Sequence, residues 1–421
     1  MIFAHGTILP DHKLPELLTG LEEAINTTRT TQTLAPETVI AALEALGNQL
    51  DSGALDHLLA QFATPAMLRS LAEIRPALTR QALEGKLETE LGLDWRTPQA
   101  RPFGQAQRLP LGTLFHVTAG NVAGLPAFSG VEGLLTGNIN LIKLPQGDKG
   151  LTLAILSKLV EQEPKLAPFL YAFDVPSSDK ATMQALANLA DGLVVWGGDE
   201  AVRACRALAP IGCKIMEWGH RLSFAYVAGY ENKETELTQL ARHIIHTGGL
   251  LCSSCQVIYL DSKDLAEGEA FCQYFLPLLE QAAQAQNPGL AGQRTLYAYE
   301  AYLEHITDHQ DRDAQFFPGR GCSLTLCRDA ELELSPLNGN VLVKLLPRAK
   351  LLPTLRRKKG HLQTAGLLCS PQDRDLLTDL LARAGLTRIV QVGHMSHTFP
   401  NENHDGEYSL RRYIRIVDIE L

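Results

Sequence analysis

Long hydrophobic runs are absent from this sequence of 421 residues. A helix that crosses a membrane needs about 20 consecutive, mainly apolar residues. The longest apolar stretches here, such as 192–196, have only the length of a β-strand. The first residues also lack the basic segment and apolar run of a secretory signal. We therefore expect no membrane span and a cytoplasmic location.

An excess of basic residues is missing as well. The chain has 38 Lys and Arg against 47 Asp and Glu, which gives a formal net charge of −9. Such a chain is a poor general binder of nucleic acid, and we expect no nucleic-acid partner. Its 45% hydrophobic and 20% charged residues exclude a disordered or fibrous protein, and its length predicts two or three domains.

Cysteine is too sparse and dispersed for a disulfide scaffold. The eight cysteines are Cys205, Cys213, Cys252, Cys255, Cys272, Cys322, Cys327 and Cys369. Cys252 and Cys255 have Cys-x-x-Cys spacing, and a zinc site that they complete with Cys322 and Cys327 is an alternative with poor spacing in the second pair. We expect buried thiols and no metal site.

The standard nucleotide-binding fingerprints are also lacking. The sequence contains neither Gly-x-Gly-x-x-Gly nor a Walker phosphate loop. Gly197 and Gly198, however, follow an apolar strand and precede a predicted helix, whose free amides can face an anion such as a pyrophosphate. An ordinary turn and helix cap is the alternative.

Helical and strand patterns divide the chain. Apolar residues at three- and four-residue spacing predict helices over 13–91. Strands at 114–117 and 140–144 flank a predicted helix at 125–136, which is the pattern of a βαβ unit. The alternation continues to 214–217 and predicts a doubly wound parallel sheet.

A second α/β region follows from about residue 231. The chain closes with an alternating, strand-like segment at 412–421. A terminal strand of this kind either completes a sheet or pairs with another subunit.

Cys252 is the strongest candidate for chemistry. It lies between Gly248-Gly249 and Ser253-Ser254, after a predicted helix and before a strand. A tight turn there can expose the sulfur, as a nucleophile requires. The alternative is a buried, inert thiol.

Two further polar residues suit acyl chemistry. Glu217 ends an apolar strand beside Trp218, where a raised pKa would suit a general base. Asn121 can offer an amide to a developing oxyanion. A solvated glutamate and an asparagine that stabilises a turn are the alternatives.

Several segments, in this order, resemble the LuxC-type acyl-CoA reductases (fatty acid reductases) of the aldehyde dehydrogenase superfamily. They are 118–122, 137–145, 195–202, 217–221 and 252–254. The resemblance covers about residues 105–260, and 403–406 is similar to the family's C-terminal pattern.

The resemblance implies an aldehyde dehydrogenase-like α/β fold. An N-terminal helical segment and a Rossmann-type doubly wound parallel sheet would form an NAD(P)-binding domain over 1–228. A second α/β domain, over 229–390, would carry the catalytic nucleophile. Residues 391–421 would return to the first domain or to a subunit interface as an oligomerisation strand, so a homo-oligomer, dimer or tetramer, is expected.

The resemblance also implies a role for each candidate residue. Cys252 would be the nucleophile, Glu217 the general base 35 positions earlier (252 − 217 = 35), and Asn121 the oxyanion donor. The cofactor-binding residues implied are Lys143 at the adenine ribose, Gly197, Gly198 and Val202 at the pyrophosphate turn, and Glu333 as a loose counterpart of a ribose-binding glutamate. Gln146 replaces a glutamate that selects NAD, so NADPH and NADH are both expected as cofactors.

The implied activity is NAD(P)H-dependent reduction of a fatty acyl thioester, such as an acyl-CoA, to the aldehyde through a thioacyl-cysteine. An acyl-carrier protein or a partner acyltransferase is an alternative acyl donor. Oxidation of an aldehyde, acyl transfer without redox chemistry, and a non-catalytic scaffold that binds a nucleotide or a carrier protein remain alternatives.

Two groups of residues have open roles. Phe271, Tyr274 and Phe275 are candidates for an acyl pocket or for ordinary core. The late histidines could bind a metal, but solvated loop positions are the preferred interpretation; they are His394, His397 and His404.

Overall fold

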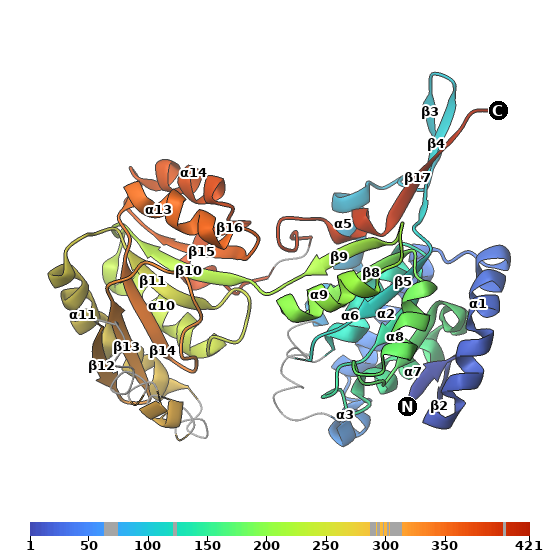
Figure 1. The fold of residues 1–421 in the computed structure, drawn as a ribbon, viewed down its shortest axis with the longest axis horizontal. Helices are drawn as coiled ribbons and strands as arrows, with labels where there is room; N and C mark the ends of the chain where they lie inside the picture. The colour runs from blue at the N-terminus through green and yellow to red at the C-terminus, as the bar shows by residue number, and fades with distance from the viewer. Residues whose placement is uncertain are drawn as a thin grey trace. The chain divides into compact units, whose positions relative to one another are not determined.

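The computed structural model describes residues 1–62, 75–120, 124–286, 292, 295–297, 299–300, 303, 314–398 and 401–421. The chain forms two compact units (Figure 1). Unit 1 comprises Met1–Gly219 and Phe399–Leu421, and unit 2 comprises His220–Thr398. The domains expected from the sequence change at 228 and 390 instead. The first boundary differs because residues 222–227 form a strand in the sheet of unit 2.

The described part of residues 14–91 in unit 1 is mainly helical, as the apolar spacing over 13–91 predicts. The described helices are α1 (Leu14–Thr31), α2 (Pro36–Asp51), α3 (Asp56–Phe62) and α5 (Arg80–Leu91). On α1 the buried residues include Leu17, Leu21 and Ile25, so one stripe of the helix faces the core. Pro36 begins α2, where its missing N–H is not needed. The predicted helical positions at 64–74 lie outside the described residues, Thr64 and Pro65 among them.

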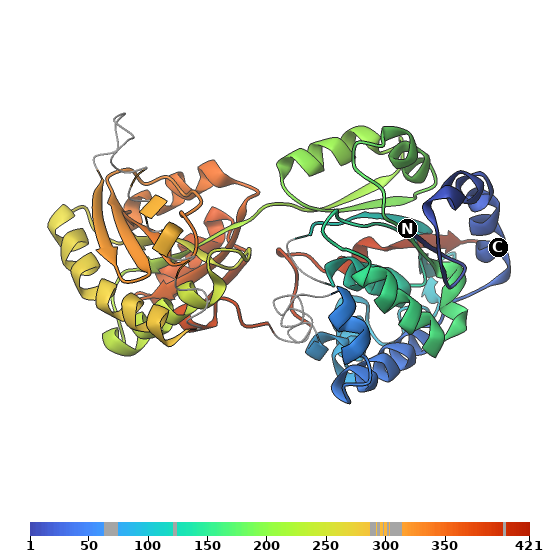
Figure 2. The ribbon, with the colours of Figure 1, turned by 90° about the horizontal axis from the view of Figure 1, so that it is seen from below.

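A parallel sheet forms the centre of unit 1. Its parallel strands are β5 (Thr113–Val117), β6 (Ile139–Lys143), β7 (Leu170–Phe173), β8 (Gly192–Trp196) and β9 (Lys214–Trp218). The helices between them are α6 (Leu125–Leu135), α7 (Leu151–Gln162), α8 (Lys180–Asn188) and α9 (Asp199–Leu208). Figure 2 shows helices on both sides of this sheet. The strand order β7-β6-β5-β8-β9 reverses direction at β5, so a topological switch point lies between β5 and β8.

A short N-terminal hairpin extends this sheet and was not predicted. It consists of β1 (Ile2–Ala4) and β2 (Thr7–Leu9), and β1 pairs antiparallel with β7. All three residues of β1 are buried. Three apolar residues are too few to show the period of a strand in the sequence.

The second α/β region forms unit 2. Its strands are β10 (Leu222–Val227), β11 (Cys255–Leu260), β12 (Gln315–Gly319), β13 (Cys322–Cys327), β14 (Asn340–Leu345), β15 (Leu362–Leu368) and β16 (Arg388–Gln391). Its described long helices are α10 (Lys233–Thr247), α11 (Leu265–Ala285), α13 (Arg348–Leu355) and α14 (Arg374–Ala384). The sheet order is β12-β13-β14-β11-β10-β15-β16, parallel except for β12.

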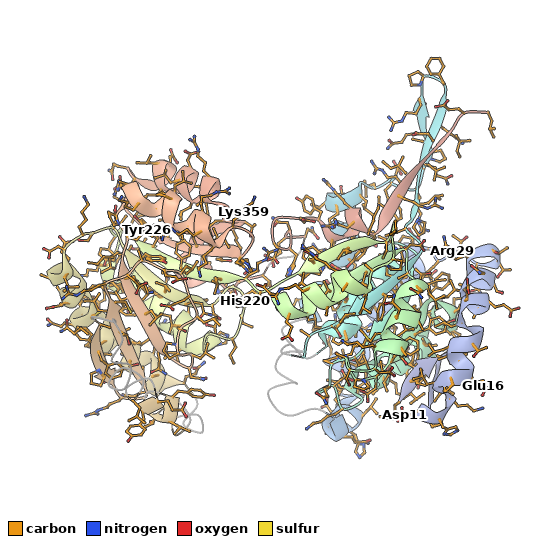
Figure 3. All side chains as sticks on the ribbon, viewed as in Figure 1. Asp11, Glu16, Arg29, His220, Tyr226 and Lys359 are labelled. Carbon is orange, nitrogen blue, oxygen red and sulfur yellow. The ribbon has the colours of Figure 1, made fainter. Side chains whose placement is uncertain are left out.

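Buried aromatic side chains brace the centre of this second sheet. Tyr226, labelled in Figure 3, lies on β10, and its hydroxyl donates to the carbonyl of Leu346 at 3.0 Å. Phe224 packs edge-on against Tyr259 of β11, with ring centroids 5.4 Å apart. The two central strands are therefore held by side chains as well as by their backbone ladder.

The closing segment completes a small sheet within unit 1. β17 (Ile414–Ile419) pairs antiparallel with β4 (Gly104–Pro110), which also pairs with β3 (Gln99–Arg101). Figure 1 shows this three-stranded ribbon projecting from unit 1. The expectation of a strand at 412–421 is confirmed, and the strand completes a sheet in its own chain.

Buried polar contacts anchor the start of this segment on unit 1. α15 (Ser409–Arg412) precedes β17. The Ser409 hydroxyl donates to Glu132 at 2.8 Å, and the backbone N–H of Leu410 donates to Glu90 at 2.7 Å. Among the described residues, no helix is both long and apolar enough to cross a membrane.

Candidate active site

Cys252 lies on the turn that joins α10 to β11 in unit 2. Gly248 and Gly249 begin the turn with φ of 58° and 82°, which favour glycine. A Cβ at Gly249 would also lie 2.8 Å from Cδ2 of Leu337. Cys252 is exposed, Cys213 is half-buried, and the other six cysteines are buried. The exposure that a nucleophile requires thus occurs at the cysteine predicted from the sequence.

Hydrogen bonds hold the turn around Cys252. The Leu251 N–H donates to the Ser254 hydroxyl, and the Ser254 N–H donates to the Leu251 carbonyl, both at 2.9 Å. The Ser223 hydroxyl donates to the Cys252 carbonyl at 2.6 Å and accepts from the Thr364 N–H at 3.0 Å. The backbone of Cys252 is therefore tied to β10 and β15.

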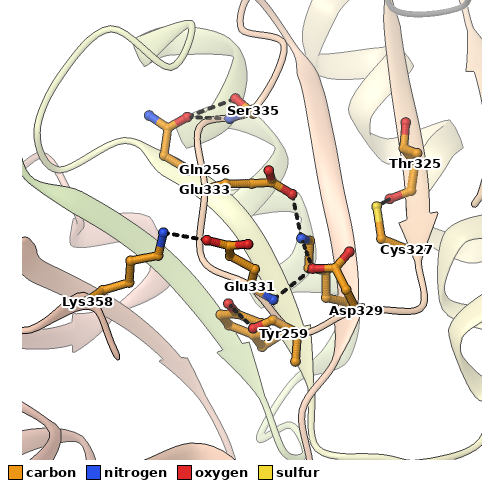
Figure 4. A network of polar contacts seen from close by, with 11 residues as sticks. Gln256, Tyr259, Thr325, Cys327, Asp329, Glu331, Glu333, Ser335 and Lys358 are labelled. Carbon is orange, nitrogen blue, oxygen red and sulfur yellow. Dashed lines mark hydrogen bonds and ion pairs between the residues drawn. The ribbon is translucent and has the colours of Figure 1, made fainter. Parts of the chain in front are cut away.

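The segment that contains Glu333 lies close to the start of this turn. Gln256 donates from its amide nitrogen to the Gly249 carbonyl at 2.8 Å, and its amide oxygen accepts from Ser335 (Figure 4). The Asn338 N–H donates to the Gly248 carbonyl at 2.8 Å. This segment therefore helps to hold the first residues of the turn that carries Cys252.

Glu333 itself pairs with a buried lysine. Figure 4 shows Asp329 and Glu333 converging on one ammonium group, that of Lys344, with both N–O distances 2.6 Å. The Lys344 side chain is fully buried, so it needs anionic partners. This pairing gives Glu333 a structural role that the sequence did not suggest.

The other predicted cofactor residues lie in unit 1, on strand β6, on the turn after β8 and on the helix that follows this turn. β8 ends at Trp196, and Gly197 and Gly198 lead into α9 beside the topological switch point. A Cβ at Gly197 would lie 3.0 Å from Cβ of Ala201, so a larger residue would be crowded at this turn. Val202 follows in the first turn of α9.

Lys143 ends β6 at the same edge of the sheet. Its side chain is buried, which lowers the pKa of its ammonium group against the opposing influence of Asp174. Within the described part of the chain, its Nζ makes no hydrogen bond and is not among the fully buried polar atoms that lack a partner, so the ammonium can reach the polar groups of a ligand.

Glu217 lies on β9 of unit 1, and its carboxylate pairs with Arg206 of α9. The guanidinium donates through Nε and Nη2, the latter 2.7 Å from Oε2. Both carboxylate oxygens of Glu217 therefore take part in an ion pair. Cys252 and Glu333 belong to unit 2, and Asn121 lies outside the described residues.

The remaining candidates have other surroundings. Phe271 and Phe275 are buried and stacked in the core of unit 2. Tyr274 is exposed, with the Lys233 ammonium 4.0 Å above its ring. His394 stacks on His397.

The described part of the chain contains no group of three or more His, Cys, Asp or Glu side chains placed to hold a metal ion. His404 instead contacts the rings of Trp196 and Trp218, with centroids 5.1 and 5.0 Å away.

Sequence reasoning missed three residues of the site. They are Arg206, Ser223 and Lys344. Each acts through a partner on another element of the fold, and the sequence carries no local pattern for such a contact. Only Lys344 could have been noticed in the sequence, because a lysine inside the apolar run of β14 predicts an acidic partner nearby.

Comparisons with known proteins identify the family and the fold of the chain. The family model described as acyl-CoA reductase (LuxC) matches residues 37–416, most of the chain. Long-chain acyl-protein thioester reductase 2 of Photobacterium leiognathi is 23% identical over 349 residues, which cover 80% of this chain and 70% of that protein. The long-chain acyl-protein thioester reductase of Aliivibrio fischeri is 24% identical over 355 residues, which cover 81% of this chain and 71% of that protein.

Solved structures of aldehyde dehydrogenases share the fold. Succinic semialdehyde dehydrogenase from Streptococcus pyogenes, solved with NADP+, has a TM-score of 0.70 at 12% identity over 99% of this chain and 96% of that one. Betaine aldehyde dehydrogenase from Staphylococcus aureus has a TM-score of 0.70 at 11% identity over 97% of this chain and 87% of that one. The predicted aldehyde dehydrogenase-like α/β fold is confirmed, and the chain belongs to the acyl-CoA reductase (LuxC) family, a family of aldehyde-forming reductases.

Proposed function

We propose that this enzyme reduces a fatty acyl thioester to the aldehyde through a thioacyl intermediate on Cys252. The observation that carries the proposal is the exposure of Cys252 on a hydrogen-bonded turn. The other cysteines of the chain are buried or half-buried. Membership of the acyl-CoA reductase family supports the same chemistry. The acyl donor is an acyl-CoA or, as the names of the curated relatives suggest, a protein-bound thioester.

In the first step the Cys252 thiolate attacks the thioester carbonyl. A new carbon–sulfur bond forms, and the bond to the donor sulfur breaks with release of the donor thiol. Asn121 and the backbone amide of Cys252 would donate to the oxyanion of the tetrahedral intermediate, each contributing about 3 kcal/mol in comparable sites. The product of this step is the acyl group held on Cys252.

Residues of unit 1 would hold the nicotinamide cofactor. Lys143 fits the role, because its buried ammonium can donate to ribose hydroxyls or a phosphate. Gly197 and Gly198 would admit the pyrophosphate to the start of α9, beside Val202. When bound, NADPH or NADH would supply the hydride that reduces the thioacyl group, after which collapse of the thiohemiacetal on Cys252 releases the aldehyde.

Apolar residues beside the nucleophile support a fatty acyl substrate. Leu250 is 64% exposed and Leu251 is 37% exposed, directly before Cys252. Exposed leucines at a nucleophile offer an apolar contact to an acyl chain as it bonds to the sulfur. We propose that they contact the first methylenes of the substrate.

Glu217 would act on protons or on water. As a base it would activate water toward the thioacyl group and release fatty acid as a side product. Its pairing with Arg206 keeps the carboxylate in one place on β9. Glu333 remains proposed at the cofactor ribose, beside its contact with Lys344.

We also propose that β17 contributes to self-association. It is the edge strand of its sheet, and Ile416 on it is 62% exposed. Light scattering of the purified protein in comparison with an Ile416→Lys variant would measure this. A monomeric wild-type protein would contradict it.

The test of the proposed function is consumption of NADPH and of NADH, measured separately with acyl-CoAs of graded chain length and with identification of the product. We expect aldehyde from the wild type and none from Cys252→Ala. Cys213→Ala is the matched control, since it removes a half-buried thiol of unit 1, and it should retain activity.

Intact-mass measurement of the same mixtures, with the cofactor omitted, separates the steps. An acyl adduct on wild-type protein that is missing from Cys252→Ala supports the nucleophile. If wild-type protein forms neither adduct nor aldehyde with acyl-CoA or acylated carrier protein, the proposal is wrong.

A further inference from the structure

A buried histidine lies behind the turn that carries Cys252. His243 is on α10 and only 7% exposed. Its Nε2 atom lies 3.3 Å from the backbone nitrogen of Cys255 and accepts that N–H. Cys255 is the first residue of β11, three positions after the nucleophile. The imidazole therefore connects the helix before the turn to the strand after it.

The second ring nitrogen of His243 continues this contact through two serines. Nδ1 lies 3.3 Å from the Ser396 hydroxyl, which lies 3.2 Å from the Ser253 hydroxyl. Because Nε2 is an acceptor, the proton of the neutral ring is on Nδ1, where the Ser396 hydroxyl can accept it. Ser396 can then donate to Ser253, the residue next to Cys252. The backbone of Ser253 also hydrogen-bonds the ring and raises its pKa, against the effect of burial.

The ring is neutral near pH 7. Burial lowers the pKa of His243 to about 4, and the nearby His246 and His397 act in the same direction. A neutral imidazole can accept at one nitrogen and donate at the other, whereas the protonated ring can only donate. The acceptor that Cys255 uses is therefore available at physiological pH.

We propose that His243 is a positioning residue, which holds the Cys252 turn through Cys255 on one side and through Ser396 and Ser253 on the other. This inference rests on the proposed role of Cys252 as the nucleophile. Ser223 holds the Cys252 carbonyl, and Leu251 and Ser254 bond to each other within the turn, but none of these contacts ties the turn to α10. His243 supplies the contacts on the far side of the nucleophile.

The consequence concerns the geometry of attack. A nucleophile must lie about 3–3.5 Å from the reacting carbon, and a displacement of about 1 Å can cost about a hundredfold in rate. Loss of the His243 contacts should therefore slow acyl transfer and kcat. The KM for the nicotinamide cofactor should change little, because its proposed ligands are mainly in unit 1.

The experiment compares His243→Leu with His243→Gln. Leucine fills similar space without hydrogen bonds, whereas the glutamine amide oxygen can accept the Cys255 N–H as Nε2 does. Hydrogen–deuterium exchange of a peptide that covers 250–257 reports on the turn directly. Single-turnover acylation by acyl-CoA, kcat and KM report on its consequence.

We expect His243→Leu to speed exchange in this peptide and to lower acylation and kcat at least about tenfold. We expect His243→Gln to restore most of both. Leu279→Ala is the control for stability, because it removes buried side-chain volume from α11 in the same unit. It should lower the Tm but leave the exchange of 250–257 and kcat near wild type.

Two results would overturn the inference. One is His243→Leu with unchanged exchange, and the other is faster exchange with unchanged acylation and kcat. If wild-type protein fails to form an acyl adduct at all, the proposed function fails. The exchange measurement then still decides whether His243 holds the turn.

Discussion

Glu217 and Arg206 form a two-point ion pair between β9 and α9, with Nη2 2.7 Å from Oε2 and Nε bonded to Oε1. The arginine side chain is 62% exposed, so water screens the pair and it contributes little to the stability of the fold. The pair matters because it determines how available the Glu217 carboxylate is to accept a proton. Arg206 donates to both carboxylate oxygens, so in the role proposed for Glu217, that of a base toward water, this pairing would hinder it.

This pairing predicts the ratio of products. Glu217→Gln removes the base, so fatty acid released per aldehyde formed should fall severalfold, while acylation of Cys252 stays near wild type. Arg206→Gln frees the carboxylate and should raise that ratio. Chromatographic measurement of acid and aldehyde from one reaction checks both. Equal ratios in the two variants and the wild type would show that Glu217 does not activate water.

Lys143 is expected to serve the cofactor and not the acyl group. Lys143→Met keeps a long side chain but removes the ammonium. The KM for NADPH or NADH should rise about tenfold or more with kcat unchanged, because the lost contact binds the ground state and the transition state equally. The rate of Cys252 acylation without cofactor should not change. Lys158→Met, which alters a lysine paired with Glu161 on α7, is the matched control. A Lys143 variant with wild-type KM would remove this residue from the cofactor site.

The buried Lys344 makes Glu333 important for stability. Glu333→Gln leaves the ammonium with one fewer anionic partner, and we expect a loss of about 1–3 kcal/mol in the free energy of unfolding, less than for complete loss of a buried pair. Asp329→Asn is the matched variant at the same ammonium. Urea unfolding measures the stability, and the KM for the cofactor is measured alongside. A rise in KM only in the Glu333 variant would support a second role at the ribose.

His116 should make unit 1 sensitive to acid. It is fully buried on β5, and its ring nitrogens lie 2.6 Å from the Ser129 hydroxyl and 3.0 Å from the Asn140 side-chain oxygen. Burial lowers its pKa to about 4, below the value of about 6.5 in an unfolded chain. The unfolded state therefore binds more protons between these two values, and stability falls as pH falls through this window.

From these values, one such histidine lowers stability by about 2 kcal/mol between pH 7.5 and pH 5. Unfolding of the wild type and of His116→Gln at both pH values checks this, because the variant should lose about that much less on acidification. The same loss in both proteins would show that His116 does not cause the acid sensitivity.

Much of the fold was accessible from local patterns. The βαβ alternation between 114 and 217 predicted the parallel strands and the helices between them, because each buried strand of a parallel sheet is a short apolar run. The turn that exposes Cys252 was predicted from glycines and serines around it. The N-terminal strand β1 was not predicted, because it is short and its partner β7 is about 170 residues away in the sequence.

The sequence by itself determined the order of strands and helices, the exposed cysteine turn and the family, because these depend on residue types at short spacing. Only the tertiary structure decided the partners of the polar side chains: Arg206 for Glu217, Lys344 for Glu333, and His243 for the Cys255 amide. The physical reason is that a hydrogen bond or ion pair forms over about 3 Å. Whether two groups come that close depends on how separate helices and strands pack, and local sequence patterns do not encode this packing.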